Sequence, residues 1–109
     1  MNVQVESLKE YTIVSVEGRI DSTNAGEFEK PMMKVIDGGC AKLILDCSGL
    51  NYISSSGLRI FLIVLKKMIA VNGQFSLCNL QPGIKEIFDI SGFSSIFSVF
   101  PDKEAALKM

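Results

Sequence analysis

The pattern of apolar and polar residues predicts a chain that opens with two strands. Residues 2–6 and 11–17 alternate apolar and polar side chains, which is typical of strands with one buried face. The polar segment 7–10 between them is short, so we expect the two strands to form an antiparallel hairpin. Gly18 is predicted to end this hairpin.

The next segment has the spacing of a helix whose buried face comprises Ala25, Phe28, Met32, Val35 and Ile36. One of the residues 22–24, Ser-Thr-Asn, is expected to cap it. Pro31 lies inside this helix and costs about 3 kcal/mol there, because it removes a hydrogen bond and crowds the carbonyl four residues back. We therefore expect a kink, a break or a restart near residues 29–31. Asp37-Gly38-Gly39 should end the helix.

The rest of the chain alternates strands and helices. An apolar strand over 42–47 should be followed by a loop and then by the longest helix, from Ser55 to about Val71. Apolar residues recur at helical spacing in that helix, at Leu58, Phe61, Leu62, Leu65, Met68 and Ile69. The remaining expected elements are a strand over 74–79, a helix over 82–91 that buries Ile84, Ile87 and Phe88, a strand over 96–100, and a last helix after Pro101 with Ala105 and Leu107 facing inward.

This order of elements predicts an α/β fold. Strands that alternate with helices need crossover connections, so after the hairpin they should run parallel. The helices are too few to cover both faces of a sheet. We therefore expect a mixed, mostly parallel sheet with helices packed mainly on one face. A chain of 109 residues is long enough for one core, so residues 1–109 are expected to form a single domain.

Charge and hydropathy argue against several classes of function. The net charge is −1, from 11 basic and 12 acidic residues, and no basic stripe is present, so direct binding of nucleic acid is not expected. The most apolar stretch, 58–71, contains Lys66 and Lys67, which argues against membrane insertion. The sequence starts in an alternating strand rather than a signal peptide, and its three cysteines form no Cys-x-x-Cys pair. We expect free thiols and a cytoplasmic location.

The chain also lacks the usual equipment of an enzyme. It has no histidine, which removes the common general base for a serine nucleophile and most ligands of zinc or iron. It has no Gly-x-x-x-x-Gly-Lys-Ser/Thr loop for nucleotide phosphates. The sequence therefore predicts a protein that is not an enzyme, with no cofactor and no metal site.

Three consecutive serines and a glycine, residues 54–57, stand where the strand over 42–47 gives way to the longest helix. Serine is a favoured N-cap, and the positive end of the helix dipole favours an anion at the same place. From the spacing alone, a helix cap with two exposed loop serines is the favoured interpretation.

The motifs around these serines resemble those of the STAS domain, the family that includes the bacterial anti-sigma factor antagonists. Residues 43–48, Leu-Ile-Leu-Asp-Cys-Ser, followed by 54–58, Ser-Ser-Ser-Gly-Leu, are similar to the family's strand ending in Asp-x-Ser and its Asp-Ser-Ser-Gly-Leu or Asp-Ser-Thr-Gly-Leu. Residues 18–21, Gly-Arg-Ile-Asp, resemble the Gly-x-Leu-Asp after the family's N-terminal hairpin. The family's phosphorylated serine corresponds to Ser55, and Ser54 replaces the Asp before it.

The resemblance implies a STAS fold and a set of site residues. Ser55 is the predicted phosphorylation site, and Ser56 is the second candidate. The predicted partner-binding residues are Asp21, Ser54, Ser55, Ser56, Gly57, Leu58 and Arg59. Asp21 would lie close to the phosphoserine, although it fits equally well as a helix cap. Arg59 either pairs with a phosphate or a partner carboxylate, or it is an ordinary surface arginine.

The resemblance further implies an anti-sigma factor antagonist that is switched by its partners. The unphosphorylated protein would bind an anti-sigma factor with serine kinase activity and thereby free a sigma factor. Phosphorylation would end the binding, and a serine phosphatase would restore it. The alternative is a STAS subunit of a transporter or signalling assembly that never cycles through phosphorylation. Ser54 in place of the family Asp favours this alternative.

Overall fold

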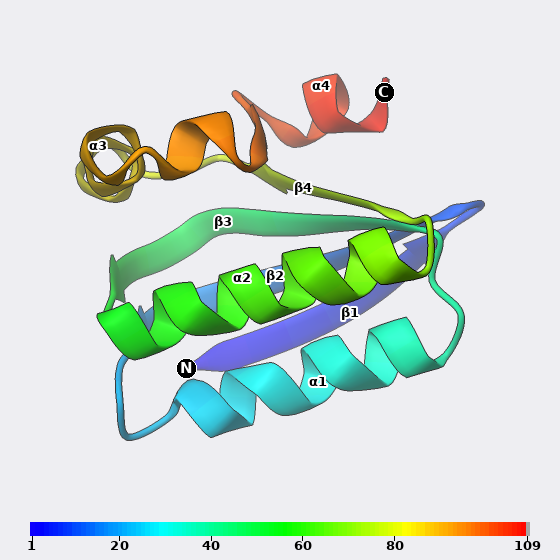
Figure 1. Cartoon of the computed structure of the whole chain (residues 1–109), viewed down its shortest axis with the longest axis horizontal. Coiled ribbons are helices and arrows are strands. Elements are labelled where there is room, and N and C mark those ends of the chain that lie inside the picture. Colours follow the sequence, from blue (N-terminus) through cyan, green and yellow to red (C-terminus); the bar gives the residue numbers. More distant parts are fainter. Residues whose placement is uncertain (109) are drawn as a thin grey trace.

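A five-stranded mixed sheet with helices mainly on one face forms the fold, as the order of elements predicted (Figure 1). The computed structural model describes residues 1–108. The strands are β1 (Asn2–Leu8), β2 (Tyr11–Ile20), β3 (Lys42–Ile53), β4 (Gln74–Cys78) and β5 (Ser98–Phe100). The helices are α1 (Ala25–Asp37), α2 (Ser55–Ala70), α3 (Pro82–Ser91), the 3-10 turn η1 (Phe93–Ser95) and α4 (Lys103–Leu107). The sheet has the order β1-β2-β3-β4-β5, and only the β1–β2 pair is antiparallel.

The two faces of the sheet bury different residues because successive side chains of a strand point to opposite sides. Val14, Leu45 and Leu77 belong to the main core beneath α1, α2 and α3. Their neighbours Ile13 and Ile44 join a small second cluster with the short helix α4. Figure 1 shows α1 and α2 lying alongside each other across the main face. The predicted distribution of helices is thus confirmed.

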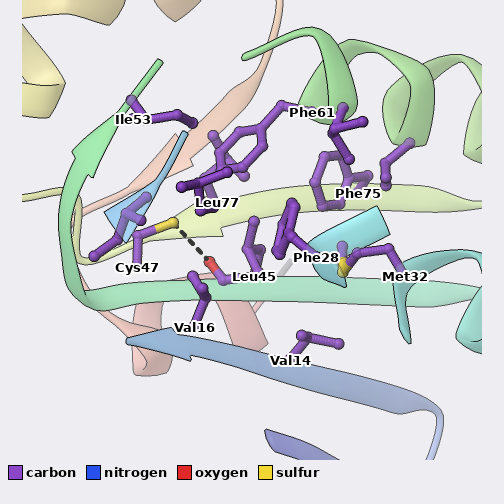
Figure 2. Close-up of a cluster of buried hydrophobic side chains, with 14 of the residues drawn as sticks. Val14, Val16, Phe28, Met32, Leu45, Cys47, Ile53, Phe61, Phe75 and Leu77 are labelled. Atoms are coloured by element: carbon purple, nitrogen blue, oxygen red, sulfur yellow. Dashed lines mark hydrogen bonds between the residues drawn. The ribbon is translucent and has the colours of Figure 1, made fainter. Parts of the chain in front are cut away.

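Aromatic rings fill the centre of the main core. The ring of Phe61 in α2 lies 5.6 Å from that of Phe28 in α1, measured between centroids (Figure 2). It also lies 6.1 Å from Phe88 in α3 and 6.4 Å from Phe97 before β5. Phe61 therefore joins three separate segments of the chain. Such ring pairs stabilise a core by about 0.5–1.5 kcal/mol beyond their buried area.

Helix α1 continues through Pro31, so the break or restart expected near residues 29–31 is wrong. The carbonyl that loses its partner there belongs to Glu27, which is exposed and can bond to water. Phe28 and Met32 are both fully buried and hold the helix against the sheet on either side of the proline. Their packing outweighs the local cost of the proline.

Strands β2 and β3 are longer than the sequence pattern predicted. The expected loop after residue 47 is part of β3, and Gly18 does not end β2. Gly18 has a φ of 100° and lies at a shift in the β2–β3 register, where it pairs with Leu50. Leu50 and Ile53 are buried in the extended part of β3. These two side chains draw the otherwise polar segment into the sheet.

The burial of three helical residues differs from the prediction. Ile69 and Ile87 are 63 % and 42 % exposed, because each lies next to a residue that occupies the buried stripe of its helix. In α4, Ala106 is buried rather than Ala105. The segment over 93–95 forms a 3-10 turn that the sequence pattern did not predict, and β5 consequently starts at Ser98.

The cysteines differ in burial, which gives a testable prediction. Burial raises the pKa of the Cys47 thiol well above its ordinary value and that of Cys78 to about 12. Cys40 is only partly buried. Because the thiolate is the reactive form, we expect one of the three thiols to react with a chromogenic disulfide at about pH 8, and all three to react after denaturation. Rapid reaction of two or more thiols in the native protein would contradict this burial.

Candidate functional site

The candidate site lies where β2 and β3 end and α2 begins (Figure 1). Ile20 pairs with Ile53 at the ends of the two strands. The backbone N–H of Ser54 donates a hydrogen bond of 2.9 Å to the carbonyl of Ile20. This bond fixes the serine run at the carboxyl edge of the sheet.

Ser54 is the N-cap of α2. Its Oγ accepts a hydrogen bond of 3.3 Å from the N–H of Gly57, and its carbonyl accepts one of 3.0 Å from Leu58. Serine and aspartate are about equally good N-caps. Ser54 therefore provides the cap that an aspartate would provide, without the negative charge.

Ser55 is the first residue of α2 and is exposed. Its hydroxyl has no hydrogen-bond partner among residues 1–108. The backbone N–H groups of Ser55 and Ser56 likewise find no acceptor in the described chain. An anion on the Ser55 side chain would meet these N–H groups and the positive end of the helix dipole. Ser56 is half-buried, so its hydroxyl is less accessible.

Gly57 lets the start of α2 pack directly on the two strand ends. It is buried, and a Cβ at this position would lie 2.7 Å from Cγ1 of Ile53 and 2.8 Å from Cγ2 of Ile20. Leu58 is half-buried and packs against the main core. Both residues thus help to position the exposed Ser55.

Asp21 orders the connection between β2 and α1. Its Oδ1 accepts hydrogen bonds from the hydroxyl of Thr23, at 2.6 Å, and from the N–H of Thr23, at 3.0 Å. The hydroxyl bond is the main reason why the pKa of this carboxyl is lowered. The cap position of α1 belongs to Asn24, so the interpretation of Asp21 as a helix cap is wrong. Because Asp21 follows Ile20 directly, it lies at the same sheet edge as the serine run.

An arginine beside Asp21 was not predicted from the sequence. The guanidinium of Arg19 lies 4.2 Å from the ring centroid of Tyr52, and its Nε lies 4.0 Å from Oδ2 of Asp21. Arg19 and Tyr52 pair in the β2–β3 register. The sequence could not reveal this contact because residues 48–53 were expected to form a loop.

Arg59 lies one turn further along α2. It is exposed and forms no ion pair within residues 1–108. Arg59 and Ser56 both line a groove of about 360 Å³ between α1 and α2. The predicted site residues are therefore grouped around one helix start, with Arg59 on the side that faces α1.

A buried carboxylate lies in β3 opposite the end of β4. Asp46 in β3 accepts hydrogen bonds from the N–H of Ser48, at 3.0 Å, and from the side-chain amide of Asn79, at 3.1 Å. Gln81 donates a further bond of 2.8 Å to the Ser48 carbonyl. These bonds tie β3 to the segment after β4.

The site offers exposed hydroxyl and charged side chains at the start of α2. Across residues 1–108, no group of three His, Cys, Asp or Glu side chains is placed to hold a metal ion. No helix in the described part of the chain is long and apolar enough to cross a membrane. The Ser55 hydroxyl is exposed at the start of α2, and the nearby Arg59 forms no ion pair within residues 1–108.

Comparisons with known proteins identify relatives over nearly the whole chain. Residues 2–106 match the STAS domain family. The chain is 39 % identical over 106 residues to BtrV of Bordetella bronchiseptica, which is assigned as an anti-sigma factor antagonist; the match covers 97 % of this chain and 91 % of BtrV. The crystal structure of an anti-sigma factor antagonist from Mycobacterium paratuberculosis is similar with a TM-score of 0.90 and 25 % identity, over 98 % and 91 % of the two chains. The unphosphorylated form of the antagonist SpoIIAA has the same fold, with a TM-score of 0.79 and 22 % identity over 95 % and 92 %.

Proposed function

The chain belongs to the STAS domain family, and from this premise we propose that it is an anti-sigma factor antagonist whose binding is switched by phosphorylation of Ser55. The proposed partner is an anti-sigma factor with serine kinase activity. A serine phosphatase would reverse the modification. The relatives named anti-sigma factor antagonist support the general role.

The observation that carries the proposal is the environment of Ser55. Ser54 already fills the capping role, so the hydroxyl of Ser55 is exposed and free of internal hydrogen bonds among residues 1–108. A kinase can reach it without opening the fold. This environment is the main argument for Ser55 over the half-buried Ser56.

The chemistry of the switch would be carried out by the partner. The Ser55 oxygen attacks the γ-phosphorus of ATP, the bond to the ADP oxygen breaks, and the serine proton passes to a base of the kinase. The chain has no histidine that would serve as this base. The product gains about −1.5 to −2 charges and three acceptor oxygens.

The added charge acts on binding rather than on the fold. At the start of α2 the phosphate meets unpaired N–H groups and the positive helix end, which stabilise it in the free protein. In an interface the same charge must be desolvated, and it repels any carboxylate that the partner brings close to it. Phosphorylation is therefore expected to release the anti-sigma factor while the domain stays folded.

Phosphorylation mapping tests the proposal directly. The protein and its Ser55→Ala and Ser56→Ala variants are incubated with ATP and a purified serine-kinase-type anti-sigma factor from the same genome. We expect the original protein and Ser56→Ala to gain one phosphoryl group, and Ser55→Ala to gain none, by mass spectrometry of the intact protein. A phosphoryl group that Ser55→Ala still gains, or that maps to Ser56 alone, overturns the assignment to Ser55.

A second candidate function rests on the absence of a carboxylate at position 54. A STAS subunit that does not cycle would need no acidic residue beside the acceptor. It would remain bound to a transporter or signalling complex, and Ser55→Asp would not affect that association. The cap formed by Ser54 weakens this alternative, because the replacement keeps the geometry of the helix start.

A further inference from the structure

A groove runs between the first halves of α1 and α2, immediately beside the serine run. Its volume is about 360 Å³. Figure 1 shows that both helices begin at the same end of the sheet and run side by side. Ser56 lines the groove and directly follows the predicted phosphoacceptor, so the groove extends the exposed site toward α1.

The floor of the groove is lined by small and apolar residues, and Ile63 is the more exposed of its two isoleucines. Ala25 and Gly26 contribute little volume from α1, and Ile60 and Ile63 form the α2 side. A Cβ at Gly26 would meet no atom within 4 Å. Apolar surface of this kind gains stability when a side chain excludes water from it.

The rim of the groove carries two opposite charges that are both unpaired. Glu29 of α1 and Arg59 of α2 line the same groove from facing helices. Neither forms an ion pair with the other, or with any other residue in the described chain. Arg19 differs from them, since it contacts both Tyr52 and Asp21. Glu29 and Arg59 thus remain available to charged groups of a second molecule.

We propose that this groove receives an apolar side chain of the anti-sigma factor, with an acidic group of the same partner segment facing Arg59 and a basic group facing Glu29. The inference rests on the proposed function, because the partner that modifies Ser55 must cover the adjoining surface. The groove would give the partner a second contact beside Ser55, and this contact would help to hold the partner over the Ser55 hydroxyl. The inference also assigns Gly26, Glu29 and Ile63 to the binding surface, in addition to the residues predicted from the sequence.

Filling the groove tests the inference. Gly26→Leu places a side chain in the empty space, and Gly83→Leu is the matched control. Gly83 is the second residue of α3, as Gly26 is of α1; a Cβ added at Gly83 would also meet no atom within 4 Å, and Gly83 does not line the groove. Binding is measured by calorimetry with a purified serine-kinase-type anti-sigma factor from the same genome. We expect Gly26→Leu to raise Kd about tenfold or more and Gly83→Leu to leave it unchanged.

The outcomes separate this inference from the proposed function. If the original protein binds and both leucine variants bind equally well, or equally poorly, the groove is not a docking site, while the proposed function stands. If the original protein does not bind, both proposals fall. Circular dichroism checks the fold of each variant. If Gly26→Leu does not fold, Arg59→Ala decides, because this exposed residue is expected to weaken binding and reduce its salt dependence. An unchanged Kd for Arg59→Ala would then overturn the inference.

Discussion

Replacement of Ser55 by glutamate is expected to weaken binding to the anti-sigma factor about 5- to 150-fold. The glutamate places a negative charge at the start of α2, where the phosphate would lie. It carries one charge, whereas a phosphoserine carries about −1.5 to −2, so the phosphorylated protein should bind more weakly still. An acidic group in the first turn of a helix contributes about 0.3–1 kcal/mol of stability, so the free energy of unfolding should not fall.

Ser55→Gln is the matched control for this prediction, because glutamine has nearly the shape of glutamate without its charge. Calorimetric titration of both variants with the anti-sigma factor gives the comparison, and urea unfolding gives their stabilities. Equal affinities for the glutamine and glutamate variants would show that size, rather than charge, weakens binding, and would argue against an electrostatic switch.

Gly57→Ala is expected to lower the free energy of unfolding by about 1–3 kcal/mol, the usual cost of adding atoms to a packed core. The new Cβ would lie 2.7 Å from Ile53 and 2.8 Å from Ile20, two buried side chains at the ends of β3 and β2. Neither can turn away freely, so the start of α2 must shift. For a domain of this size, the melting temperature should fall by about 4–8 °C for each kcal/mol.

The same substitution at Gly83 should act in the opposite direction. Nothing lies within 4 Å of a Cβ there, and alanine is favoured over glycine in a helix by up to about 1 kcal/mol. Thermal unfolding of the two variants therefore tests the packing of Gly57 independently of helix propensity. Because the start of α2 carries Ser55, Gly57→Ala should also slow the phosphorylation of the folded protein. Equal stability changes at both glycines would contradict the close packing of Gly57 on the two strand ends.

Local periodicity was sufficient to predict most of the fold. The apolar alternation in the first strands, the apolar run before Asp46 and the helical spacing after Ser55 each reflect which side of an element faces the core. The same pattern placed Ser55 at a helix start, where the structure also has it. The phosphoryl-acceptor role itself came only from the resemblance to a family, because a serine at a helix start is common for structural reasons alone.

The sequence did not reveal features that depend on contacts between distant segments. Strand β3 extends to Ile53 because it pairs with the end of β2, where the register of the two strands shifts. No alternation of apolar and polar residues within 48–53 indicates this extension. The continuity of α1 through Pro31 depends on the packing of Phe28 and Met32 against the sheet. The groove beside Ser56 exists because small residues of α1 face α2 there, which single-element patterns do not describe.

The strand order has a consequence for how the domain is made. Each strand pairs only with the strands that precede and follow it along the chain. Only one helical segment therefore lies between the two strands of each parallel pair. The sheet can grow strand by strand, in the order in which the polypeptide leaves the ribosome. The strand ends and helix start that frame Ser55 all lie before β4 in the sequence. The switch region can thus take shape on the nascent chain while the segments that complete the core, including Phe88 and Phe97, are still being synthesised.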